Sequence, residues 1–183
     1  MKNLIYNLKE SIKRAEVDKI ATIYAYYVQN ANRFGIVELD ENNKAISIEE
    51  KPENPKSNYA VTGLYFYPAG VAQKAKEIKP SERNEFEITD LNKFYLEENR
   101  LYVSVLGRGY SWFDAGTHES LSEASESIRI LENRQGLKVC CPEEIAYING
   151  WISKENLLKQ AEIMKENPYG QHLYNVALGK IKY

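Results

Sequence analysis

The run Tyr59-Ala60-Val61-Thr62-Gly63-Leu64-Tyr65-Phe66-Tyr67 decides the fold class of this 183-residue chain. It is apolar and aromatic with little polar alternation, which predicts a central strand covered on both faces by helices or further chain. Gly63 interrupts the bulky side chains. An interior glycine marks either a bulge or a ligand that lies close to the backbone, and both interpretations remain open here.

Strand and helix patterns alternate on both sides of this run. Further strands are predicted at residues 22–28, 35–39, 45–49 and 101–106, with the turn residues 40–43 joining two of them into a hairpin. Helical spacing occurs at residues 3–16, 71–78, 87–99, 117–131, 142–149, 153–166 and 169–179. We therefore expect an α/β core over residues 1–116 and a helical annex over residues 117–183, folded as one unit.

The composition narrows the possible partners. The chain is 43% hydrophobic, with 24 basic and 26 acidic residues and a net charge of -2. It has no basic surface signature for a nucleic acid and no apolar run of membrane-spanning length. Cys140 and Cys141 are sequence neighbours, which rarely reach disulfide geometry with each other. We expect a cytoplasmic protein that works on small molecules, with no nucleic-acid or membrane partner.

The stretch Glu49-Glu50-Lys51-Pro52 places two acids and a lysine where a predicted strand ends. Proline cannot donate a backbone hydrogen bond, so Glu50 and Lys51 should enter a loop, where side chains are accessible to ligands. An ammonium group there can be held by a carboxylate and still donate to a phosphate. The alternative is a solvated charge cluster without a ligand.

The stretch Trp112-Phe113-Asp114-Ala115-Gly116-Thr117 places an acid at a tight turn before a helix that Thr117 could cap. Such a carboxylate could hold Mg²⁺ together with substrate phosphate oxygens. Trp112 could cover the face of a sugar or a base. An ordinary turn aspartate and a core tryptophan are the alternatives.

Three other features carry no expected chemistry. Gly107-Arg108-Gly109 lacks the third glycine and the strand-to-helix turn of a nucleotide-binding loop. His118 and the pair Cys140-Cys141 are expected to be helix-terminus and core residues. With two histidines and no paired ligand motif in the sequence, we do not expect a zinc site with nitrogen and sulfur ligands, and any metal should be oxygen-bound.

A series of ordered motifs resembles the glucose-1-phosphate thymidylyltransferases over essentially the whole chain. The motifs are Arg33-Phe34-Gly35-Ile36-Val37-Glu38, Glu49-Glu50-Lys51-Pro52, residues 55–67, Lys79-Pro80-Ser81, Glu87-Ile88-Thr89-Asp90, Gly107-Arg108-Gly109, residues 112–118, 134–139, 142–146 and 169–171. The resemblance implies a mixed-sheet nucleotidyltransferase fold of the nucleotide-diphospho-sugar transferase type. It also implies the joining of dTTP to glucose 1-phosphate with release of pyrophosphate, assisted by Mg²⁺, for dTDP-rhamnose synthesis.

The resemblance further implies roles for particular residues. Glu50 would accept hydrogen bonds from sugar hydroxyls, Lys51 would hold the sugar phosphate, Arg83 would approach the phosphates, and Asp114 would be one of two metal aspartates. The remaining implied sugar-site residues are Phe34, Gly35, Val61, Gly63, Tyr65 and Trp112. An allosteric site would involve Gly107, Cys141 and Glu144.

The chain also departs from that family. The family's first strand, its Gly-rich triphosphate loop and its base pocket have no counterpart here, and Lys2 stands where the second metal aspartate is expected. We therefore expect a fold that is incomplete at its N-terminus and inactive alone, forming a homo-oligomer or a complex with a nucleotide-binding chain. Weak binding of glucose 1-phosphate or a dTDP-sugar is expected to remain. Ile148 replaces an expected arginine, which argues against feedback control. The alternative function is a non-catalytic sugar-phosphate-binding or assembly module that partners a full-length homologue.

Overall fold

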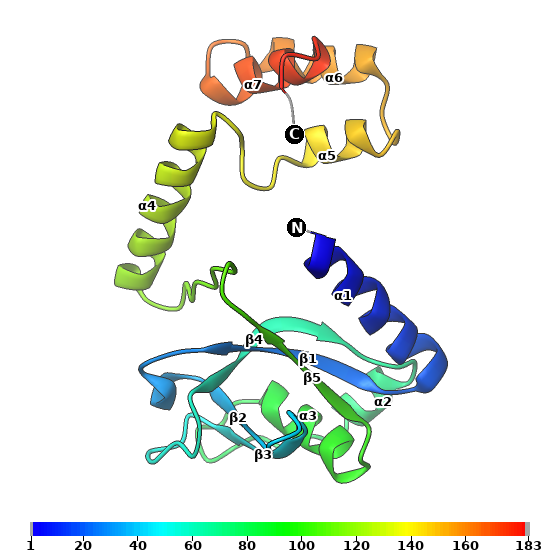
Figure 1. Ribbon diagram of the computed structural model, residues 1–183, viewed down its shortest axis with the longest axis vertical. Helices are drawn as coiled ribbons and strands as arrows, with labels where there is room; N and C mark the ends of the chain where they lie inside the picture. Colours follow the sequence, from blue (N-terminus) through cyan, green and yellow to red (C-terminus); the bar gives the residue numbers. More distant parts are fainter. Residues whose placement is uncertain (1, 182–183) are drawn as a thin grey trace. The chain divides into compact units, whose positions relative to one another are not determined.

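The computed structural model describes residues 2–181, and Lys2, discussed above, lies in its first helix, where side chains before residue 8 are not described. The chain divides into two compact units, one ending at Trp112 and one beginning at Phe113. Each is described separately below (Figure 1).

The first unit is an α/β structure built on one mixed sheet of five strands, as the sequence predicts. Its strands are β1 (Ala21–Tyr27), β2 (Gly35–Leu39), β3 (Ala45–Glu50), β4 (Tyr59–Phe66) and β5 (Leu101–Leu106). Its helices are α1 (Lys2–Lys13), the π-helical turn η1 (Arg14–Asp18), the 3₁₀ turn η2 (Ala31–Arg33), α2 (Val71–Ala75) and α3 (Ile88–Glu97). The sheet order is β3-β2-β4-β1-β5, in which β1 and β5 are parallel and the other pairs are antiparallel.

The run that opened the sequence analysis forms β4, the middle strand of the sheet. Ala60, Val61 and Thr62 are buried, whereas Gly63 and Leu64 are exposed. The prediction of a strand covered along its whole length was therefore right for the first half only. The strand is open at Gly63 and Leu64 because these two residues line a surface cavity, described below.

The core of the first unit lies against the sheet. One buried cluster joins all five strands through Ile23, Val37, Ile48, Val61 and Val103. A second cluster packs Leu91 and Tyr95 of α3 against Ala21 of β1, and α3 lies alongside β3. Burying these side chains fixes the position of α3, whose first turn faces the end of β3.

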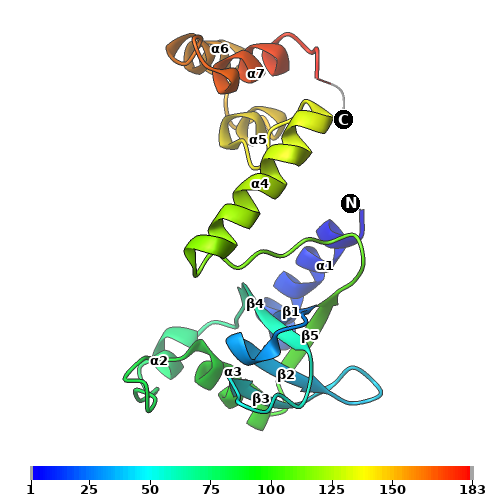
Figure 2. The ribbon, with the colours of Figure 1, turned by 90° about the vertical axis from the view of Figure 1, so that its left-hand side faces the viewer.

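Every regular element of the second unit, among the described residues, is a helix. It contains α4 (His118–Gln135), α5 (Pro142–Ile148), α6 (Lys154–Ile163) and α7 (Pro168–Ala177). Thr117 caps α4 as predicted, accepting the backbone N–H of Ser120 at 3.1 Å. Helices α6 and α7 lie side by side (Figure 2) and enclose an apolar cluster of Cys141, Leu157, Ala161, Leu173, Val176 and Ala177. No helix in the described part of the chain is both long and apolar enough to cross a membrane.

Candidate functional site

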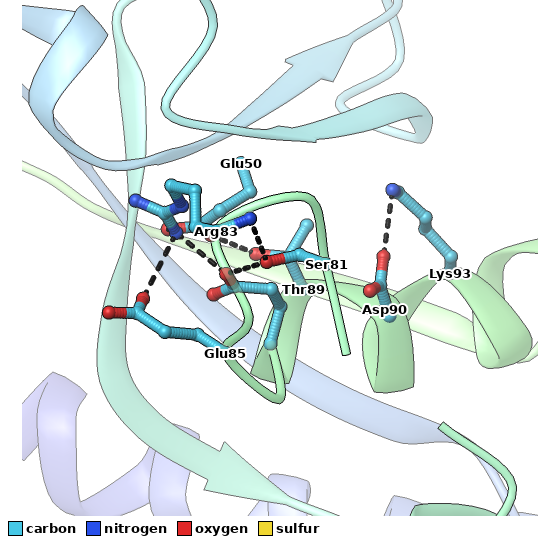
Figure 3. A network of polar contacts seen from close by, with 8 residues as sticks. Glu50, Ser81, Arg83, Glu85, Thr89, Asp90 and Lys93 are labelled. Carbon is cyan, nitrogen blue, oxygen red and sulfur yellow. Dashed lines mark hydrogen bonds and ion pairs between the residues drawn. The ribbon is translucent and has the colours of Figure 1, made fainter. Parts of the chain in front are cut away.

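Glu50 is the last residue of β3, and two side chains fix the orientation of its carboxylate. The Thr89 hydroxyl, in the first turn of α3, donates to Glu50 Oε2 at 2.5 Å. The Arg83 guanidinium lies 3.5 Å from Glu50 Oε1. Figure 3 shows this group beside the start of α3. A half-buried carboxylate held from two directions is a preorganised hydrogen-bond acceptor, which is what recognition of hydroxyl groups requires.

Gly35 makes this arrangement possible. It pairs with Glu50 across β2 and β3. A Cβ atom at position 35 would lie 2.9 Å from Thr89 Oγ1, closer than real Cβ contacts, and 3.0 Å from Glu50 Oε2, which is tighter than most real Cβ contacts. Glycine therefore lets the carboxylate and the hydroxyl lie directly against the β2 backbone.

Arg83 is the centre of a group of acids. Its Nη2 atom lies 2.7 Å from Glu87 Oε1 and 3.5 Å from both Glu50 Oε1 and Glu85 Oε2. The Ser81 hydroxyl donates to Glu87 Oε1 at 2.8 Å. The hydrogen bond from Arg83 holds the pKa of the buried Glu87 carboxyl below its ordinary value, although burial opposes this effect. A phosphate that approached Arg83 would meet a guanidinium already engaged by carboxylates.

Lys51 lies just beyond the end of β3, as the sequence predicts, and its backbone is left-handed with φ of 42°. Its N–H donates to Phe34 O at 3.0 Å, and the residue is exposed. The two preceding acids are engaged elsewhere, because Glu49 pairs with Lys56 at 2.8 Å and Glu50 contacts Thr89 and Arg83. The positive charge of Lys51 also contributes to the lowered pKa of Glu87, after the larger effects of Arg83 and Ser81.

A surface cavity of ≈ 360 Å³ lies elsewhere in this unit, but a second one of ≈ 340 Å³ adjoins β4. The second is lined by Thr62, Gly63, Leu64, Leu106, Tyr110, Ser111 and Trp112. The pairing of β1 with β4 shifts between Ile23 and Ala25, so β4 is bulged at Gly63. Apart from Gly63 itself and its two chain neighbours, no residue has an atom within 4 Å of where a Gly63 Cβ would be. The structure thus contains the bulge and also leaves room for a ligand beside the backbone.

Two aromatic residues, Tyr110 and Trp112, line this cavity, and Trp112 also packs against a buried cluster of Ala31, Ile36 and Ala60. Trp112 lies with its ring 5.1 Å from that of Phe34, edge to face at 72°, and 6.2 Å from that of Tyr26. Tyr65 stacks on Tyr67 at 5.9 Å. Burial and the nearby Glu50 charge raise the pKa of Tyr65, so its hydroxyl stays protonated at neutral pH.

The other residues implied by the resemblance have different settings. Val61 has its side chain in the core, so only its backbone can face a ligand. Gly107 directly follows β5 and is exposed. Asp114 belongs to the second unit, where its Oδ1 accepts the Gly116 N–H at 3.2 Å. It is therefore a turn aspartate, and its half-exposed carboxylate oxygens are of the type that Mg²⁺ prefers.

Thr89 and Glu87 were given no individual role by the sequence analysis, although both lie in one of the motifs that carried the resemblance. Cys141 and Glu144 lie in the second unit together with His172, whose Nε2 is 2.6 Å from Glu144 Oε2. This grouping was also missed. Spacing along one helix relates Cys141 to Glu144, but nothing local relates either residue to α7.

Comparison with known proteins gives consistent results. A family model described as nucleotidyl transferase matches residues 2–130. A glucose-1-phosphate thymidylyltransferase from Neisseria meningitidis is 54% identical over 153 residues, which cover 84% of this chain and 53% of that protein. One from Mycobacterium tuberculosis is 46% identical over 173 residues, covering 93% and 60%. The chain thus spans little more than half the length of these curated relatives.

Two solved structures share the fold. A Bacillus anthracis protein assigned as a glucose-1-phosphate thymidylyltransferase, in complex with sucrose, has a TM-score of 0.57 and 38% identity, covering 69% of this chain and 48% of that one. A UDP-glucose pyrophosphorylase complexed with UDP-glucose has a TM-score of 0.55 and 22% identity, covering 70% and 48%. The similarity to the UDP-glucose pyrophosphorylase concerns the fold alone. The expected nucleotide-diphospho-sugar transferase fold and the resemblance itself are confirmed.

Proposed function

The chain belongs to the nucleotidyl transferase family, and from this premise we propose that it binds glucose 1-phosphate for thymidylyl transfer from dTTP. Glu50 and Lys51 are the central residues of this proposal. The activity, substrates and partners of the longer relatives are part of the proposal as well, because the chain spans only 53% to 60% of the relatives compared above.

The Glu50 carboxylate accepts hydrogen bonds from two sugar hydroxyls, while Thr89 and Arg83 hold it in place. Lys51 donates to the phosphate oxygens from its exposed position at the strand end. The ring of Trp112 and the open backbone at Gly63 accept the apolar face of the sugar. Hydrogen bonds to charged groups contribute about 1.5 to 3 kcal/mol each, so Glu50 and Lys51 supply most of the affinity.

In the reaction, an oxygen of the sugar phosphate attacks the α-phosphorus of dTTP. A new P–O bond forms, the bond between the α-phosphorus and the bridging oxygen breaks, and pyrophosphate leaves. Positioning and charge neutralisation provide most of the catalysis in such in-line transfers. Asp114 would hold Mg²⁺, which neutralises phosphate charge when bound. Lys51 keeps the attacking phosphate oriented.

One observation carries this proposal: the Glu50 carboxylate is fixed by Thr89 and Arg83 against Gly35, immediately before Lys51. A surface charge cluster without a ligand would not need a glycine to bring the carboxylate against the backbone. This arrangement therefore favours the binding interpretation of Glu49-Glu50-Lys51-Pro52 over the solvated cluster.

Calorimetric titration with glucose 1-phosphate tests the proposal. Lys51→Asn removes the ammonium group and keeps a residue that tolerates left-handed backbone. We expect the affinity of Lys51→Asn to fall about 10-fold to 150-fold, because a charged hydrogen bond of about 1.5 to 3 kcal/mol is lost. Glu50→Gln should weaken binding as well, whereas Glu49→Gln is the matched control and should stay close to wild type.

Two results would contradict the proposal. One is a wild-type chain that gives no heat with glucose 1-phosphate. The other is a Lys51→Asn variant that binds glucose 1-phosphate as well as wild type does. Pyrophosphorolysis of dTDP-glucose with Mg²⁺ then separates the two alternatives from the sequence. Turnover supports transferase activity in these residues, and binding without turnover supports a sugar-phosphate-binding module.

A further inference from the structure

Three chemically different side chains meet inside the second unit, in a place that the proposed sugar site does not use. Cys141 precedes the first turn of α5, Glu144 lies in that turn, and His172 lies on α7. One ligand atom from each lies within 4.8 Å of the other two. All three residues are buried, and the side chains of His172 and Glu144 are 5% and 8% exposed.

Local helix structure and the packing of helices together explain why these three side chains lie close to one another. Cys141 and Glu144 are three residues apart, so they project from the same side of α5. His172 reaches them from α7, with Nε2 2.6 Å from Glu144 Oε2. Cys141 belongs to the same apolar cluster as Leu157 and Leu173. Polar and ionisable groups are costly in such surroundings unless they bind one another or a metal ion.

We propose that Cys141, Glu144 and His172 bind one zinc-type divalent transition-metal ion. A thiolate sulfur, an imidazole nitrogen and a carboxylate oxygen are the ligands that zinc accepts, whereas Mg²⁺ and Ca²⁺ require more oxygen ligands. Tetrahedral zinc, with bonds of about 2.0 to 2.3 Å, places its ligands about 3.3 to 3.8 Å apart. The Glu144–His172 separation of 2.6 Å is shorter than this range and would have to lengthen around an ion, whereas no pair of ligand atoms is more than 4.8 Å apart.

The surroundings of the cluster suit a metal centre. The Cys141 thiol donates to the Tyr169 hydroxyl at 3.2 Å, and that hydroxyl donates to Glu143 Oε2 at 2.5 Å, so a hydrogen-bonding group that could orient a metal ligand lies next to the sulfur. When the ion binds, the Cys141 S–H bond breaks, the sulfur donates its electron pair to the metal, and the proton leaves to solvent. Tyr169 can then turn its single O–H from Glu143 to the thiolate.

The site has a route to solvent within the second unit. His172 lines a cavity of ≈ 490 Å³ together with Lys138, Gln171 and Asn175. The ion can enter through this cavity, and a water molecule from it can complete the fourth coordination position. The competing interpretation is a metal-free Glu144–His172 hydrogen bond that joins α5 to α7 beside the Cys141 side chain.

Cobalt binding to the tag-free full chain tests the proposal, because Co²⁺ reports a thiolate ligand directly. We expect one Co²⁺ per chain, with a near-ultraviolet thiolate-to-cobalt charge-transfer band that added Zn²⁺ abolishes. Cys141→Ser should lose the band. His172→Gln and Glu144→Gln should weaken binding by more than about tenfold, the smallest loss expected even for an outer-shell partner. Cys140→Ser is the matched control, because Cys140 is exposed, and it should keep the band.

Two measurements on wild type keep the test decisive even if a variant fails to fold. The charge-transfer band needs no variant, and Zn²⁺ should raise the melting temperature of the chain with a saturable dose dependence. A wild-type chain without the band or without the thermal shift would overturn the proposal. A band that Cys140→Ser removes would overturn it as well, because the sulfur ligand would then be the wrong cysteine.

Discussion

Gly63 exposes the backbone of β4 to a cavity, and replacing it with alanine separates two roles that glycine can have in a strand. The new methyl group would meet no atom within 4 Å, so the fold should tolerate it. We expect the free energy of unfolding of Gly63→Ala to stay constant or rise by up to about 1 kcal/mol, because the unfolded chain loses freedom. Binding of glucose 1-phosphate should weaken several-fold, as measured by calorimetry beside urea unfolding. If Gly63→Ala binds glucose 1-phosphate as well as wild type does, the bulge alone would explain why a glycine stands at this position.

Gly35 provides the contrast at the same scale. Its added Cβ would press on the hydrogen-bonded pair Thr89–Glu50. Gly35→Ala should therefore reduce both stability and binding, whereas Gly63→Ala reduces binding alone. The two glycines look alike in the sequence, and only the neighbours that packing brings to them distinguish their roles.

The segment that leads into α3 depends on an ion pair, which predicts a pH dependence. The pKa of Glu87 is held below its ordinary value of 4.5, chiefly by the hydrogen bond from Arg83. A lowered pKa in the folded state stabilises the protein above pH 4.5, and this contribution is lost as the pH falls through the folded-state pKa. Wild type should lose stability on this acid side more steeply than Glu87→Gln, as measured by urea unfolding from neutral to acid pH.

A control on α4 identifies the source of this effect. Glu126 pairs with Arg129 on an exposed helix face, where solvent screening weakens the effect of an ion pair on stability. The loss of stability at acid pH should therefore be nearly the same in Glu126→Gln as in wild type. Equal changes in the two variants would show that the setting of Glu87 before α3 has no special importance.

Element by element, the sequence predicted most of the secondary structure. The hairpin of β2 and β3, the end of β3 at Glu50 and the start of α4 after Thr117 were all placed correctly. Local periodicity and capping chemistry determine such features within a few residues. The predicted helix at 71–78 is shorter, because α2 ends at Ala75 and the chain then turns.

For the whole molecule, we predict self-association, as expected from the sequence. The net charge is only -2, so repulsion between copies is weak. Large apolar side chains are also exposed, including Phe86 at 72%, Trp151 at 73% and Ile163 at 76%. Sedimentation velocity over a range of concentrations should show an increase in mean mass. A single monomeric species at every concentration would contradict this expectation.

The sequence by itself determined the α/β class, the helical annex and the strand end that presents Glu50 and Lys51. The sequence also showed the family resemblance, because the order and spacing of motifs can be read directly along the chain. Only the tertiary structure decided which groups surround them. Thr89 reaches Glu50 across 39 residues, and His172 reaches Glu144 across 28. Side-chain patterns report the backbone over a few residues, whereas these contacts depend on how α3 packs on the sheet and α7 on α5. For that reason a metal site with sulfur and nitrogen ligands, unexpected from the sequence, became a proposal once the fold was known.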